Sequence, residues 1–155
     1  FRTLAGHSLA RVLWEIKLGV EDEGGRVRFV RCGHTADTSF LGLTAANLSG
    51  SGVGIGLQAK GTAVIHQKDR LPHNNLELFS NAPITAMEHY RSMGRNAAAY
   101  ARNELPEPVI VPTHGEALGA RFHARVALTY AIETEMTKNG ATPETVEITF
   151  NKEML

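Results

Sequence analysis

The 155-residue sequence lacks several features that would place it at once in a class of protein. It has one cysteine, Cys32, so the chain forms no internal disulfide and no metal site built from several thiolates. Lysine plus arginine equals aspartate plus glutamate, 16 of each, and there is no run of like charge. We therefore expect no attraction to nucleic acid or to an anionic membrane.

Long apolar runs are missing as well. No stretch approaches the roughly 20 residues that span a bilayer, and the start has no signal-peptide pattern. We therefore expect a cytoplasmic protein. With 43% apolar residues, the chain is long enough for one domain with one core. A helical pattern begins almost at once after Phe1, so we expect that a segment with the first strand of the sheet precedes it.

The stretch at residues 48–83 has the most distinctive pattern. Bulky apolar residues at 53–57 alternate with Gly54 and Gly56, and an apolar, β-branched run follows at 62–66. This pattern predicts two strands, the first with one face bare of side chains. Either a flat ligand presses against that bare face, or another layer of the protein packs closely on it. The spacing favours neither alternative.

Polar residues follow these two strands. The turn between them holds Lys60, Gly61 and Thr62, and the loop at 69–75 is rich in amide and imidazole donors. Together they predict a seat for a flat or phosphate-bearing ligand. The glycines also match a dinucleotide-binding fingerprint, but that motif needs a helix directly after it, and here a strand follows. A nicotinamide or flavin site is therefore disfavoured.

The N-terminal half predicts alternating helices and strands. A helix begins after Ser8 as its N-cap and ends at Gly24. A strand at 26–31, a helix at about 37–47 and the strand at 53–57 follow. This order predicts a parallel sheet with a right-handed crossover, and ligands gather at the carboxyl ends of such strands. Basic and apolar residues alternate in the first of these strands, so we place it near an edge.

The C-terminal half is less clear. Thr85 and Glu88 match a capping box at the start of a third helix, which extends to about residue 103. A loop follows to about residue 119. From residue 121 the apolar residues alternate, which favours a strand-like or mixed tail, although the composition of 125–138 also permits a helix.

We therefore expect an α/β fold, a single domain with a mostly parallel open sheet flanked by helices, of the Rossmann or flavodoxin-like type. Residues 1–110 form this core. Residues 111–155 form a C-terminal extension that packs on the core or on a partner subunit.

Three sequence blocks point to a known family. LSGSGVGIGLQAKGTAVIHQ at 48–67, NLELFSNAP at 75–83 and EHYRSMGRNAAAYAR at 88–102 resemble the medium, or β, subunit of adenosylcobalamin-dependent diol and glycerol dehydratases. The resemblance runs from about Ser8 to Phe150. It implies a non-catalytic subunit that holds the lower face and nucleotide tail of adenosylcobalamin against a large subunit, which carries the substrate.

The resemblance also implies the setting. Large, medium and small subunits form a heterohexamer, a dimer of heterotrimers, which is a radical lyase that converts 1,2-diols or glycerol to aldehydes with loss of water. The complex is cytoplasmic or lies inside a bacterial microcompartment, and a reactivase is a further partner. The chain itself is expected to hold no metal and no catalytic residue.

Carried over by position, the family's cobalamin contacts fall on six residues: Asp37, Lys60, Thr62 and Asn75, with Leu78 and Ser80 nearby. Lys60 can donate to a phosphate or to an amide oxygen. The Asp37 carboxylate and the Asn75 amide can pair with the corrin side-chain amides. Asp37 also suits a helix N-cap. Ser80 replaces a common proline, and the loop before Asn75 departs from the family pattern. From the bare face we infer that Gly54 and Gly56 admit the lower axial base.

Two other interpretations remain. The small subunit of the dehydratase reactivase shares the α/β core and would bind a partner protein and no cobalamin. The tail at 121–150 argues against it, because that module is expected to end near the third helix. The second interpretation is a scaffold in a protein shell that serves only in assembly.

Overall fold

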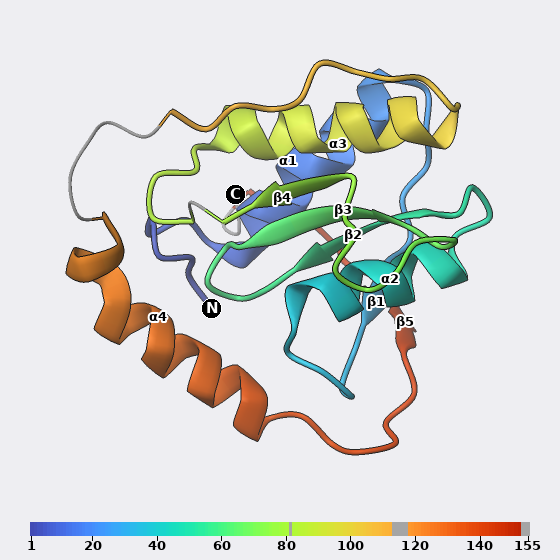
Figure 1. Cartoon of the computed structure of the whole chain (residues 1–155). Coiled ribbons are helices and arrows are strands. Elements are labelled where there is room, and N and C mark those ends of the chain that lie inside the picture. Colours follow the sequence, from blue (N-terminus) through green and yellow to red (C-terminus); the bar gives the residue numbers. More distant parts are fainter. Residues whose placement is uncertain (81, 113–117, 153–155) are drawn as a thin grey trace.

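The computed structural model describes residues 1–80, 82–112 and 118–152. Its elements, in chain order, are α1 (Leu9–Asp22), β1 (Phe29–Arg31), α2 (Thr38–Leu48), β2 (Val53–Leu57), β3 (Ala63–Gln67), β4 (Glu77–Phe79), α3 (Met87–Ala101), α4 (Leu118–Glu135) and β5 (Glu144–Val146) (Figure 1). Within these described residues, no helix combines the length and the apolar character needed to cross a bilayer.

A three-stranded antiparallel sheet, in the order β2-β3-β4, forms the centre. Helices α1 and α3 cover one face and α2 covers the other (Figure 1). The core between α1, α3 and the sheet includes the buried side chains of Val12, Ile65 and Tyr90. The α/β class is correct, but the predicted parallel open sheet is wrong. The turn between β2 and β3 is too short for a parallel crossover, which needs a dozen or more residues.

Strand β1 lies outside this sheet. It pairs with β5 in a separate two-stranded antiparallel sheet, where Arg31 and Glu144 form an ion pair of 2.7 Å. The predicted strand–helix–strand unit is therefore wrong. Beside this pair, the ring of Phe150 packs against Trp14 and Phe29, with centroids 5.0 and 5.9 Å away. The pairing thus connects the tail to the N-terminal half of the chain.

The ends of the first two helices agree with the predictions. The Ser8 side chain accepts a hydrogen bond from the N–H of Arg11, and Asp37 caps α2. Gly24 has φ +74°, the left-handed conformation expected after a helix. The third helix begins one residue later than predicted, with Ala86 in place of Thr85 at the N-cap position. The predicted capping box of Thr85 and Glu88 is wrong. The side chain that binds back to the helix start is His89, whose Nδ1 accepts the N–H of Ala86.

Helices α1 and α3 cross closely where two glycines meet. A Cβ on Gly19 would overlap the carbonyl oxygen of Arg91, and one on Gly94 would overlap that of Ile16. The small residues of the third helix thus permit close packing against α1. The two backbones approach as closely as they do because neither glycine carries a side chain.

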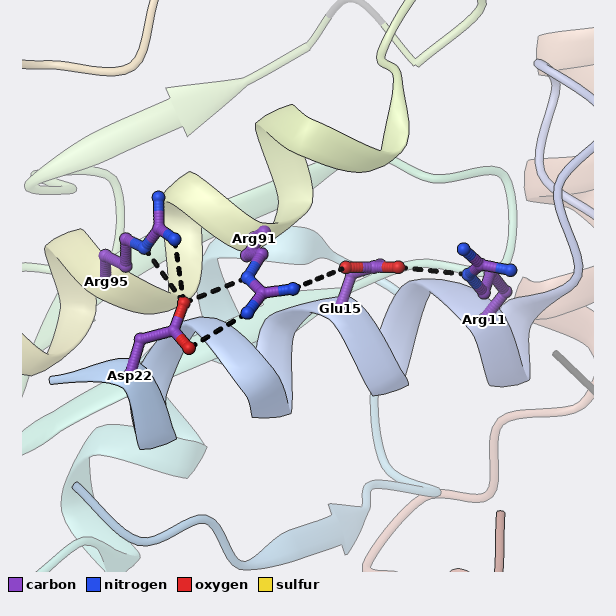
Figure 2. A network of polar contacts seen from close by, with 5 residues as sticks. All are labelled: Arg11, Glu15, Asp22, Arg91 and Arg95. Carbon is purple, nitrogen blue, oxygen red and sulfur yellow. Dashed lines mark hydrogen bonds and ion pairs between the residues drawn. The ribbon is translucent and has the colours of Figure 1, made fainter. Parts of the chain in front are cut away.

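Charged side chains connect the same two helices along their surface (Figure 2). The Asp22 carboxylate accepts hydrogen bonds of 2.8–3.0 Å from the guanidinium groups of Arg91 and Arg95. Arg91 also reaches Glu15 at 3.8 Å, and Glu15 binds Arg11 at 3.0 Å. The bonds from Arg91, and then those from Arg95, lower the pKa of Asp22 to about 2.

This network predicts a pH dependence of stability. The pKa of Asp22 is 3.8 without these partners and about 2 with them, so its stabilising effect is complete above about pH 4 and is lost as the pH falls through 2. We expect Asp22→Asn to lower the melting temperature at pH 7, and the difference from wild type to shrink between pH 4 and 2. Glu88→Gln, an exposed change on α3, is the control. A difference that stays constant down to pH 2 would contradict the role of the ionised carboxylate.

The tail agrees only in part with the favoured prediction of a strand-like or mixed segment, because it contains a helix and a short strand. Residues 118–135 form α4, so the strand-like interpretation is wrong and the helical alternative is confirmed. A turn at Gly140, with φ +75°, leads to a short strand, β5. Several apolar side chains of the tail are exposed, namely Leu128, Tyr130, Ile132 and Met136. Their alternation in sequence therefore does not reflect burial on a sheet.

Candidate functional site

The turn at 58–62, between β2 and β3, is held from several sides. The N–H of Leu4 donates to the carbonyl of Lys60 at 2.9 Å, and the hydroxyl of Tyr90 donates to that of Gly61 at 2.8 Å. Burial raises the pKa of Tyr90, so its hydroxyl keeps the proton that it donates. Gly61 has φ +102°, which favours glycine. The Gln58 side-chain amide also donates to the carbonyl of Ala36.

Lys60 and Thr62 lie together on this turn. The ammonium group of Lys60 donates to the Thr62 hydroxyl at 2.9 Å, and Thr62 is buried while Lys60 is half-buried. Burial lowers the pKa of Lys60, and the charges of Glu133 and Asp37 act in the opposite direction. The lysine thus provides a partly desolvated cation next to a fixed hydroxyl group.

Asp37 and Asn75 both lie at the first turn of α2. Oδ1 of Asp37 accepts the N–H groups of Ser39 and Phe40 at 2.9 and 3.1 Å, so this residue is the helix N-cap. The Asn75 side-chain nitrogen donates to the Ser39 hydroxyl at 3.3 Å. Oδ1 of Asn75 is buried and has no hydrogen-bond partner among the described residues. A buried amide oxygen of this kind is available to a donor on a ligand.

Leu78 and Ser80 lie apart from these contacts. Leu78 is on the edge strand β4, directly opposite Val64, and its side chain is 58% exposed. Ser80 directly follows β4 and is also exposed. Within the part of the chain that the structure describes, neither residue forms a hydrogen bond with the polar residues of the turn. The structure thus brings Asp37, Lys60 and Thr62 into one region with Asn75 at its edge, and leaves the other two on the surface of β4.

The face of β2 that carries the glycines is covered by α2. A Cβ on Gly54 would overlap the N–H of Ala46, and one on Gly56 would overlap backbone atoms of Thr38 and Gly42. The inference that this face admits the lower axial base is therefore wrong. The close-packing alternative is confirmed, and its consequence is that α2 lies against the sheet and its N-terminus lies near the turn.

Sequence reasoning missed Glu133. Its Oε1 accepts the N–H of Ala59 at 2.6 Å, and its Oε2 is buried without a partner among the residues that the structure describes. Burial raises the pKa of Glu133, and the Ala59 N–H and the charge of Lys60 oppose this effect. No local pattern marks this residue, because it lies 74 positions beyond Ala59 in a segment for which a strand was favoured.

Comparisons with known proteins identify a family from the sequence and a shared fold from the structure. A model of the dehydratase medium subunit matches residues 2–107. The chain is similar to a solved structure named "Glycerol dehydratase reactivase", at 24% identity and a TM-score of 0.53, covering 62% of this chain and 83% of that one. It is also similar to a solved structure of a "diol dehydratase-reactivating factor complexed with ADP and Mg2+", at 24% identity and a TM-score of 0.52. That match covers 61% of this chain and 83% of the other. At such identity these two structures show a shared fold alone. Because the family model spans most of the chain, this protein belongs to the dehydratase medium subunit family and is part of a multi-subunit dehydratase.

Proposed function

We propose that this chain holds the lower face and nucleotide tail of adenosylcobalamin in a diol or glycerol dehydratase. The observation that carries the proposal is the cluster at the start of α2 and the neighbouring turn. There, a half-buried ammonium group, a buried hydroxyl and an unpaired buried amide oxygen lie in one region of a chain from this family. Cobalamin carries many amide groups and one phosphate, and these are the partners that such side chains bind.

The residues fit this cofactor by their chemistry. Lys60 donates, Thr62 both donates and accepts, and Oδ1 of Asn75 accepts. Asp37 fixes the helix start with Oδ1, which leaves Oδ2 without a recorded bond in the described chain. Leu78 and Ser80 provide an apolar and a polar surface on β4. When bound, adenosylcobalamin supplies the radical for the dehydration, and this chain supplies position and electrostatics.

The assembly follows from the same proposal. Large and small subunits complete a dimer of heterotrimers, the large subunit carries the substrate, and the extension at 111–155 packs on the core or on a partner subunit. Glycerol or a 1,2-diol is the substrate and an aldehyde the product. The complex works in the cytoplasm, inside a bacterial microcompartment where one is present, and a reactivase is a further partner.

A second function has one observation in its favour. The two solved structures described above are reactivases, so a reactivase small subunit, which binds a partner protein and no cofactor, has a compatible fold. Under that function, Lys60 and Asn75 have no ligand. Glu133 contacts the turn from the tail of the chain, which lies outside residues 2–107, the part that the family model matches.

Lys60→Ala tests the proposed function. We expect the dehydratase complex formed with large and small subunits to bind adenosylcobalamin roughly tenfold to a hundredfold more weakly, because one hydrogen bond from a charged group is lost. Equilibrium dialysis measures the dissociation constant. Lys68→Ala, an exposed lysine at the other end of the same hairpin, is the matched control. If Lys60→Ala and Lys68→Ala bind adenosylcobalamin with equal affinity, the assignment of Lys60 to the cofactor site is contradicted. Assembly with a reactivase large subunit and no cofactor binding supports the second function.

A further inference from the structure

The charges around the turn at 58–62 disfavour an anion as the partner of Lys60. Glu133 accepts the N–H of Ala59, the residue before Lys60, and the negative charges of Glu133 and Asp37 both act on the Lys60 ammonium group. A phosphate bound to Lys60 would lie near both carboxylates and be repelled by them. The charge of the region thus disfavours an anionic ligand group beside Lys60.

The hydrogen-bonding groups around the turn are also incompletely used. Oε1 of Glu133 accepts the Ala59 N–H, whereas the buried Oε2 has no partner in the described chain. The ammonium group of Lys60 has three N–H donors, and its recorded bond is to the Thr62 hydroxyl. Among the described ion pairs within 4.0 Å, none joins Lys60 to either carboxylate. Glu133 thus binds the residue next to Lys60 and keeps an unpaired acceptor, while Lys60 keeps N–H donors beyond its bond to Thr62, and the two side chains form no ion pair among the described residues.

A primary carboxamide has the matching groups, one acceptor oxygen and two N–H donors, whereas a phosphate has acceptors and no donor for a carboxylate. We propose that Lys60 and Glu133 together bind a peripheral carboxamide of the corrin ring: Lys60 Nζ donates to the amide oxygen, and Oε2 of Glu133 accepts an amide N–H. This inference rests on the proposed function and names the ligand group at the same site. It makes Glu133, on the last turn of α4, a cofactor-binding residue.

Two corrinoids distinguish a carboxamide from the phosphate. Cobalamin carries the peripheral carboxamides and the nucleotide phosphate, whereas cobinamide keeps the carboxamides and lacks the phosphate and the base. The assembled complex with large and small subunits is titrated with each corrinoid, and dissociation constants are measured for wild type, Lys60→Ala and Glu133→Gln. Glu135→Gln, exposed on the same helix, is the matched control. Thermal unfolding shows that each variant is folded.

We expect Lys60→Ala to weaken both corrinoids by the same factor, roughly tenfold or more. Glu133→Gln also weakens both, because glutamine has one acceptor oxygen, for which the Ala59 N–H and the ligand amide then compete. If Lys60→Ala weakens the binding of cobalamin but not of cobinamide, the lysine binds the phosphate and the inference is overturned. Tighter cobalamin binding by Glu133→Gln also overturns it. If wild type binds neither corrinoid, the proposed function itself fails.

Discussion

Gly56→Ala is expected to lower the free energy of unfolding by about 3 kcal/mol, because a methyl group here has no free space. Its Cβ would overlap Gly42 N and Thr38 O, which are backbone atoms of α2. Backbone moves less readily than the end of a side chain, so α2 must shift away from β2. Chemical denaturation measures the loss of stability.

The same shift should affect the cofactor site. Helix α2 begins beside Gly56 and carries Asp37 as its cap, so moving the helix moves that carboxylate relative to Lys60. We expect weaker cobalamin binding even under conditions where Gly56→Ala is folded. Gly50→Ala is the matched control, since nothing lies within 4 Å of an added Cβ there, and its stability should change by less than about 1 kcal/mol. Similar behaviour of the two variants would show that α2 adapts without cost.

Glu77→Ala is expected to cost about 3–5 kcal/mol, because it removes a charged acceptor of two hydrogen bonds from a buried polar network. Oε1 of Glu77 accepts from the Asn96 side chain at 2.8 Å, and Oε2 accepts from the N–H of Val109 at 2.9 Å. Asn96 also donates to the carbonyl of Glu107 at 2.8 Å. Without the carboxylate, buried donors on α3 and on the segment after it lose their acceptor.

Two further variants separate the network from a simple loss of charge. Glu77→Gln keeps one acceptor oxygen and should lose less stability than Glu77→Ala. Glu107→Gln changes an exposed side chain of the segment that the network attaches, and it should be close to wild type. Urea unfolding at pH 7 gives all three values. A cost below about 1 kcal/mol for Glu77→Ala would mean that water replaces the carboxylate.

Features that depend on a few neighbouring residues could be predicted from the sequence. Ser8 and Asp37 were expected as N-caps, and Gly24 as a helix end, because each acts on backbone groups within about three residues. The alternation at 53–57 and the apolar run at 62–66 located two strands of the hairpin to within one residue. The position of Lys60 and Thr62 in one turn followed directly.

Features that depend on distant contacts were not predictable in this way. Two bare glycines on a strand allow either a ligand or a helix to approach, and only the position of α2 distinguishes the two. Strand β1 has the pattern of a sheet edge, but its partner β5 lies far along the chain. Exposed apolar residues on α4 alternate in the sequence as they would in a strand. The contact of Glu133 with the turn was therefore not predicted.

The β1–β5 pair has a consequence for biosynthesis. Its paired residues Arg31 and Glu144 are separated by 113 positions, whereas the central sheet is built entirely from residues 53–79. During translation the sheet and its helices can fold before β5 has left the ribosome, because local pairings close first. Until then β1 presents an unpaired edge, a template for association with another nascent chain. We expect slow translation of the segment after α3 to increase aggregation of this subunit.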